Sequence, residues 1–140
     1  MKKDVTLTLK GLHLTENEEN NLESKHAGNY FCKDGVHFVM AKVIEDGITT
    51  DLRLTFDEKS LKVRRSGEVT TELVFESGMK HETMYRTPFG ALSVATHTSE
   101  YYVNLKDIEK GLIEGALKYK LYVDGNVSSD ATLVFEIKEN

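Results

Sequence analysis

Apolar and polar residues alternate along almost the whole chain, with the period of two that is expected of β-strands with one buried face. In the first such run, Val5, Leu7 and Leu9 share one face, and a change of phase after Gly11 is typical of a bulge. Further runs of the same kind cover residues 22–33, 36–45, 48–56, 61–65, 69–76, 79–87, 92–103, 117–123 and 132–138. The pattern therefore predicts about ten strand segments.

Short turns connect most of these runs. Asp34-Gly35, Asp46-Gly47 and Asp124-Gly125 each stand between two runs, and Asp-Gly is a strong signal of a two-residue hairpin turn. One short connecting helix is expected between Asn104 and Gly111. Strands without crossover helices predict an antiparallel meander, and closure into a barrel removes its unpaired edges. The expected fold is all-β, an antiparallel up-and-down β-barrel of about 8–10 strands forming a single domain over residues 1–140.

Composition restricts the class of protein. A chain of 140 residues, 39% hydrophobic and 29% charged, is typical of one globular domain. The net charge of −5 argues against broad nucleic-acid binding, and no apolar run has the length of a membrane span or signal peptide. The single cysteine, Cys32, cannot form an internal disulfide, which indicates a reducing compartment. We expect a cytoplasmic protein that binds neither membranes nor nucleic acid.

Arg65 is the most informative candidate for a binding site. It is in phase with Leu61 and Val63, so strand parity directs it toward the barrel interior. A buried guanidinium requires an anion, which could be the carboxylate or phosphate of a ligand. The alternative is structural, either stacking that closes the barrel end or an ion pair with an inward carboxylate. Glu100, in phase with Leu92, is one possible partner.

Other polar side chains could line the same interior. His81, Thr83, Tyr85 and Thr87 fall on one face of their run, and this row lines either a wet cavity or the solvent face. Tyr119 is predicted to face the interior, because apolar residues accompany it in phase. The ligand-binding candidates are Arg65, Tyr85, Tyr119, His81 and Thr87.

Catalytic and metal chemistry find little support. The Asp34-Gly35 turn places Cys32 opposite His37, and a thiol beside an imidazole is the minimum for an activated nucleophile. An orienting carboxylate and an oxyanion-hole motif are both missing, so we expect no catalytic residue. The histidines lack the spacing of a zinc site, and no glycine-rich phosphate loop occurs, so no metal or cofactor is predicted.

Two neighbouring runs, residues 22–33 and 36–45, are apolar on both faces. One face carries Phe31, Phe38 and Met40, and the other carries Tyr30, Cys32, Val39 and Val43. Either face could pack inside, and the other face then needs cover. This pattern suggests a surface for a partner or for a homodimer, although scattered exposed hydrophobic residues would also explain it.

Several motifs together resemble the bacterial YwiB-type proteins. These are Arg65-Ser66-Gly67, Tyr85-Arg86-Thr87-Pro88-Phe89-Gly90, the Thr96–Thr98 run and the late Gly111…Tyr119-Lys120-Leu121 stretch. The resemblance implies a calycin-like β-barrel, shaped like lipocalins and fatty-acid-binding proteins, in a family without an established function. Without tryptophan the chain lacks the Gly-x-Trp signature of lipocalins, and residues 16–21 replace the helical lid of fatty-acid-binding proteins. The likeness therefore gives little support to lipid binding.

Three functions remain as expectations, in order of preference. The first is a non-catalytic binder of a small, partly apolar ligand, whose charge is negative if Arg65 binds it. The second is a protein–protein interaction or self-associating module with a filled barrel. The third is a cysteine-dependent enzyme, which rests on Cys32 and His37 alone.

Overall fold

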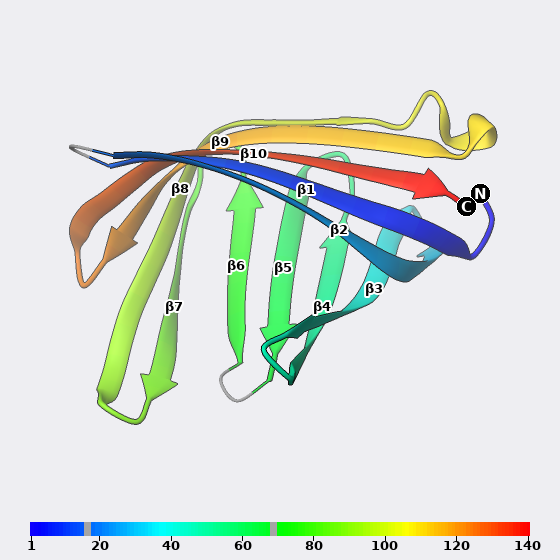
Figure 1. Ribbon diagram of the computed structural model, residues 1–140. Helices are drawn as coiled ribbons and strands as arrows, with labels where there is room; N and C mark the ends of the chain where they lie inside the picture. The colour runs from blue at the N-terminus through cyan, green and yellow to red at the C-terminus, as the bar shows by residue number, and fades with distance from the viewer. Residues whose placement is uncertain (16–17, 68–69) are drawn as a thin grey trace.

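The computed structural model describes residues 1–15, 18–67 and 70–140, with the side chains of residues 12–21, 87 and 128 left outside the description. These residues form ten antiparallel strands in one sheet, with β1 paired to β10 (Figure 1). The expected antiparallel up-and-down β-barrel is confirmed. The strands are β1 (Asp4–Thr15), β2 (Glu18–Lys33), β3 (Val36–Glu45), β4 (Ile48–Phe56), β5 (Ser60–Ser66), β6 (Thr71–Glu76), β7 (Lys80–Thr87), β8 (Gly90–Asn104), β9 (Leu112–Val123) and β10 (Asn126–Glu139).

The predicted turns are present with the backbone conformation that their residues favour. Asp34 and Gly35 have φ angles of 52° and 79°, and the Asp46-Gly47 and Asp124-Gly125 pairs are also positive at both residues. Positive φ at both central residues matches the right-handed twist of the flanking strands. The predicted connector is the 3₁₀ helix η1 (Ile108–Lys110), which Gly111 ends in the left-handed conformation. Within the described residues, no helix is long and apolar enough to span a membrane.

The bulges lie elsewhere than the sequence predicted. Pairing of β1 with β2 and β10 continues through Gly11 without a shift, so the bulge expected there is wrong. Register shifts occur instead in β8, between Thr98 and Glu100, and in β10, between Val127 and Ser129. One extra residue reverses the face of every side chain that follows it.

One end of the barrel is filled by its own side chains. The largest fully buried residues there are Phe56, Leu61, Phe75, Ile113, Phe135 and Ile137. The Phe135 ring lies directly against Gly115, where an added methyl group would clash with it. Phe56 and Phe135 meet edge to face, with their ring centroids 5.3 Å apart. Each such side chain stabilises the fold by about 1.5–3 kcal/mol on burial, so this end is the core.

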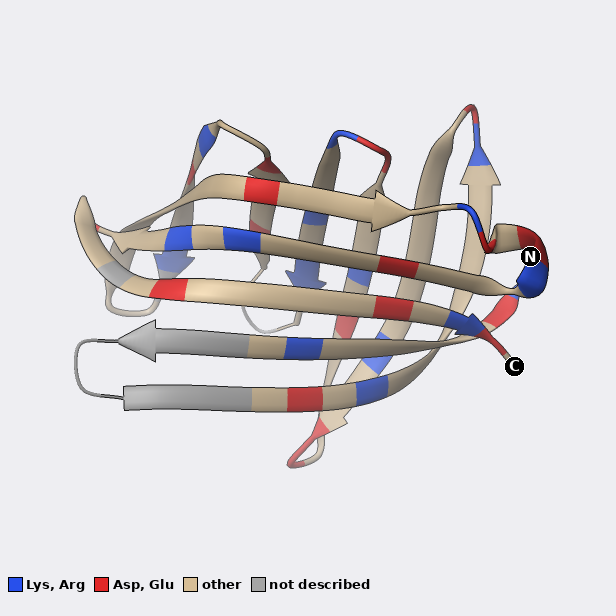
Figure 2. Cartoon of the chain, turned by 90° about the horizontal axis from the view of Figure 1, so that it is seen from above, with Lys and Arg blue, Asp and Glu red and all other residues tan. Residues whose placement is uncertain are grey.

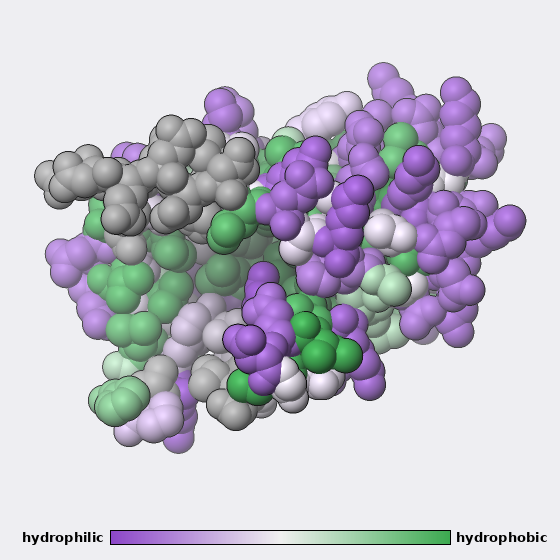
Figure 3. All heavy atoms as spheres, in the orientation of Figure 1, coloured by the Kyte–Doolittle hydropathy of each residue, from purple (hydrophilic) through white to green (hydrophobic). Residues whose placement is uncertain are grey.

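The opposite end of the barrel is open. On the inner face of β2, Tyr30 is buried, whereas Leu22 is 66% exposed. On the inner face of β4, Phe56 is buried, whereas Ile48 is 47% exposed. The strands diverge toward this end, so β1 and β2 lie above the ends of β3 to β6 (Figure 1). Figure 3 shows apolar atoms set back between the upper and lower strands. The barrel is therefore a cup with a packed base.

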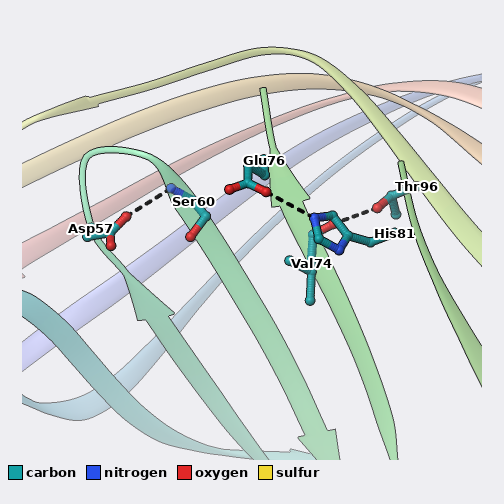
Figure 4. Close-up of polar contacts among 6 residues, drawn as sticks. All are labelled: Asp57, Ser60, Val74, Glu76, His81 and Thr96. Carbon is teal, nitrogen blue, oxygen red and sulfur yellow. Dashed lines mark hydrogen bonds and ion pairs between the residues drawn. The ribbon is translucent and has the colours of Figure 1, made fainter. Parts of the chain in front are cut away.

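The barrel wall is completed by side chains between β6 and the β7–β8 hairpin. These strands stand at the two ends of the sheet order, so no continuous ladder joins them. Thr96 Oγ1 donates to the Val74 carbonyl at 2.6 Å, and His81 Nε2 lies 3.4 Å from Glu76 Oε1 (Figure 4). At one end of this seam, the connection from β6 to β7 bonds to β8 through Gly78 N–H to Thr98 O and Thr98 N–H to Met79 O, which extends the β7–β8 pairing.

Lysines and arginines are interspersed with acidic residues over the strands of the barrel (Figure 2). A mixed surface of this kind keeps single-sign electrostatic fields small. Any local accumulation of one sign is therefore a feature of individual strand pairs rather than of a whole face.

Thr96→Val tests the seam between β6 and β8. The substitution keeps the shape of a side chain that is 1% exposed but removes the donor to the Val74 carbonyl. We expect a loss of about 1–3 kcal/mol in unfolding free energy, because a buried acceptor loses its partner. Urea denaturation measures the loss. Thr70→Val, at an exposed position, is the control, and equal stability of both variants would contradict the role of this bond.

Candidate functional site

Arg65 stands near the end of β5, at the open end of the cup. It continues the inner face of Leu61 and Val63, as predicted, but its side chain is exposed rather than buried. The expectation of burial was wrong because the strands diverge at this level and admit solvent. The guanidinium still acts on the inner wall: burial raises the pKa of the Tyr119 phenol to about 12, and the positive charge of Arg65 partly opposes that rise.

Glu100 is not the partner of Arg65. The β8 bulge between Thr98 and Glu100 reverses the parity that placed it inside, and its carboxylate lies 3.9 Å from Lys118 Nζ, where both side chains are exposed. In the part of the chain that the structure describes, Arg65 forms no salt bridge. Among the described residues, the charge of Arg65 is therefore not paired with a carboxylate.

The polar row on β7 faces the interior rather than the solvent. His81, Thr83 and Tyr85 are half-buried, whereas the residues that alternate with them are exposed. The Tyr85 hydroxyl donates to the Glu72 carbonyl at 3.4 Å, and burial raises the pKa of this tyrosine. The His81 ring turns toward Glu76 on β6, across the seam (Figure 4).

These contacts decide which candidates share one site. Thr71 lies opposite Arg65 and is followed by Glu72, whose carbonyl accepts the Tyr85 hydroxyl, so Tyr85 and Arg65 flank the same end of β6. Tyr119 adds a third polar group from the facing wall. His81 instead contacts Glu76 at the seam between β6 and the β7–β8 hairpin. The Thr87 backbone pairs with Gly90, but its side chain lies outside the described residues.

The floor between these polar groups is apolar. Tyr119 is buried and packs on Phe75, with ring centroids 4.7 Å apart. Leucines from four strands complete the wall, and all are only partly buried: Leu9, Leu73, Leu121 and Leu133. Partly exposed apolar walls around a few polar groups are typical of small-molecule sites.

Cys32 and His37 lie opposite each other, as predicted, but the structure adds a partner that the sequence reasoning missed. His37 is buried, stacks on Phe56, and its Nδ1 lies 2.7 Å from the Tyr30 hydroxyl. Burial raises the pKa of Tyr30 to about 12, with neighbouring Cys32 adding to the rise. Tyr30 is two residues before Cys32 on the same face, which is the signal that could have identified it. A tyrosine, rather than a carboxylate, thus holds the imidazole.

The outer face of β2 and β3 carries a pair of stacked aromatic rings. Phe31 and Phe38 lie opposite each other with ring centroids 4.6 Å apart, and Phe31 is 45% exposed. Met40 continues the same face and is also exposed. The apolar outer surface that the sequence predicted is therefore present.

The buried imidazole of His37 makes stability depend on pH. Burial lowers its pKa in the folded state, while the charge of Asp57 opposes this. The unfolded chain therefore binds more protons just below about pH 6.5, and the folded state loses stability as the pH falls through that region. Above that pH this group contributes no such loss.

His37→Gln should reduce this acid sensitivity, because glutamine does not titrate. Urea denaturation at about pH 7.5 and about pH 5.5 compares the two proteins. The exposed residue His97 provides the matched control in His97→Gln. If both substitutions changed the pH dependence equally, the assignment to His37 would be wrong.

Comparisons with known proteins give one family match and one similar solved structure. A family model described as "Domain of unknown function (DUF1934)" matches residues 7–134. The crystal structure of the ywiB protein from Bacillus subtilis has a TM-score of 0.85 and 18% identity, covering 99% of this chain and 92% of that chain. None of the curated proteins matches this sequence. The resemblance to YwiB-type proteins is thus confirmed at the level of the fold.

Proposed function

The chain belongs to the DUF1934 family of domains of unknown function, and from this premise we propose that it is a non-catalytic binder of a small, partly apolar, anionic ligand. One observation carries the proposal. The barrel interior is packed at one end and open at the other, where Arg65 stands on an otherwise largely apolar inner wall.

The apolar part of such a ligand would cover the exposed portions of the inner leucines. Removing apolar surface from water contributes about 25 cal/mol per Å², so covering these side chains favours binding. Barrels of eight strands already hold one small ligand, and ten strands enclose a wider interior. The likeness to calycins, which share this up-and-down architecture, is consistent with such use.

The anionic part would bind Arg65. Its guanidinium can hold a carboxylate or phosphate through two parallel hydrogen bonds. Tyr119 remains protonated at neutral pH, because burial raises its pKa to about 12, so it adds an uncharged hydroxyl to this wall. Tyr85, already bonded to the Glu72 carbonyl, would form the rim of the site.

Binding of anilinonaphthalene sulfonate, an apolar anion whose fluorescence rises in apolar surroundings, tests this site. We expect saturable binding that Arg65→Gln weakens by about tenfold or more, because a hydrogen bond to a charged group contributes about 1.5–3 kcal/mol. Arg86→Gln, which removes an exposed charge from β7, should leave the affinity unchanged. Equal affinities of the two variants, or no saturable binding, would sink the proposal. Native mass spectrometry of gently purified protein would identify a retained ligand.

The stacked pair on the outer face supports a second candidate, association of two copies through β2 and β3. Phe31 and Phe38 form a rigid apolar contact of the kind enriched at interfaces. A symmetric dimer would bring the same pair from each copy together. This function does not require the cup to bind anything.

Sedimentation velocity over a range of concentrations tests the dimer. We expect a concentration-dependent dimer that Phe31→Ser weakens by about thirtyfold or more, since an aromatic anchor carries about 2 kcal/mol or more at an interface centre. Phe89→Ser changes a residue that is 100% exposed at the β7–β8 turn and is the matched control. A protein that sediments as a monomer at every concentration would exclude this candidate.

We further propose that the protein works in the reducing cytoplasm and is not an enzyme. The free, exposed thiol of Cys32 is compatible with a reducing compartment. His37 bonds to the Tyr30 hydroxyl, which supports a structural role for the imidazole rather than activation of a nucleophile. With a net charge of −5, the chain is also not expected to bind nucleic acid broadly.

A further inference from the structure

A second hollow lies on the outer face of the barrel, where β2 separates from β3. β2 pairs with β3 only from Gly28 to Lys33, while its earlier half stays beside β1. The bend between the two directions leaves a groove of about 1010 Å³, lined among others by Asp4, Asn29, Lys42, Arg53 and Arg64. This volume is at the upper end of small-molecule sites.

Two arginines form one wall of this groove. Arg53 on β4 lies directly opposite Arg64 on β5, and both side chains are exposed. Like charges directly opposite each other on adjacent strands are destabilising. The pair therefore costs stability unless an anion lies between the guanidinium groups.

Two carboxylates lie near this pair, but neither forms a salt bridge with it among the described residues. Asp51, two residues before Arg53, also lines the groove and stands opposite Lys42. Glu72 is opposite Arg64 on the other side, but its carboxylate lies 3.9 Å from Lys62 Nζ. Arg53 bonds through Nη2 to the Met40 sulfur at 3.8 Å. In residues 1–15, 18–67 and 70–140 neither arginine forms a salt bridge, so two permanent cations are left for an external anion.

We propose that the groove binds a phosphate-bearing small molecule, with the phosphate held between Arg53 and Arg64. Guanidinium groups match the geometry of phosphate oxygens and bind them in pairs. Two positive charges balance a phosphate monoester, which carries about −1.5 to −2 at neutral pH, better than a single carboxylate. Lys42 adds a third cation to the groove.

The opposite wall of the groove could bind the part of the ligand beyond its phosphate. Asp4 and Asn29 are register partners at the start of β1 and in β2, and both line the groove. Their carboxylate and amide groups can bind hydrogen-bond donors or a positive group on the remainder of the ligand. The groove thus favours a ligand with a phosphate at one end and polar donor groups at the other.

This groove is separate from the interior of the cup. Successive residues of a strand point to opposite faces, so Arg64 lines the outer groove and Arg65 lies on the inner wall. The two arginines are therefore adjacent in sequence but belong to different sites. Substitution of either one should affect only its own ligand.

Titration with inorganic phosphate, followed by nuclear magnetic resonance of backbone amides, tests the groove. We expect saturable shifts that centre on residues 53 and 64, with a dissociation constant of about 1 mM or tighter. Arg53→Gln and Arg64→Gln should each weaken binding about tenfold or more, because each removes charged hydrogen bonds to the anion. Arg86→Gln, which removes an exposed charge from β7, should retain the affinity.

Thermal unfolding gives a second test, because the groove variants should lose phosphate affinity but not melting temperature. Without phosphate, Arg53→Gln and Arg64→Gln should match or exceed the melting temperature of the unmodified protein, since each relieves repulsion. Phosphate should raise the melting temperature of the unmodified protein and of Arg86→Gln but not of the two groove variants, because it stabilises only a state that binds it.

Absence of saturable shifts, or an equal loss of affinity in Arg86→Gln, would overturn the proposal, because phosphate would then respond to surface charge alone. Loss in Arg65→Gln with retention in the groove variants would also overturn it and place the anion in the cup. Binding of anilinonaphthalene sulfonate to the cup is measured separately, so either site can fail without the other.

Discussion

The rest of the structure depends on how β6 and β7, the two end strands of the ten-stranded sheet, are joined to close the barrel. A regular ladder does not join them, so side chains complete the wall through Thr96, His81 and Tyr85. Each bond reaches a group on β6 across a gap that backbone pairing would have filled. A wall completed in this way allows the two halves of the sheet to diverge, and their divergence creates the open end of the cup.

Because the strands diverge, the two ends of each strand lie in different surroundings. Near the base, aromatic and branched side chains fill the interior so tightly that Phe135 leaves no room for a side chain at position 115. Toward the mouth, the same inner faces carry leucines that are only partly buried, together with Arg65. Stability thus resides in the base, and the mouth is free to carry a ligand.

β5 illustrates how one short strand can serve two surfaces. Arg65 continues the inner face toward Tyr119, whereas Arg64 lies on the outer face opposite Arg53. Both side chains are exposed, so neither guanidinium has to lose its hydration in the absence of a ligand. The chain can therefore keep three arginines close together although, among the described residues, the nearby carboxylates of Asp51 and Glu72 form no salt bridge with them.

The sequence alone determined the strands, the Asp-Gly turns, the inward direction of Arg65 and the pairing of Cys32 with His37, because each follows from alternation and turn chemistry between near neighbours. The tertiary structure alone decided the outward turn of Glu100, because Tyr101, Tyr102 and Val103 after the bulge occupy both faces and leave the hydrophobic phase ambiguous. It also decided the bond from Tyr30 to His37 and the exposure of Arg65. Those features depend on where the strands diverge, and divergence arises from the packing of the whole sheet rather than from any single run of residues.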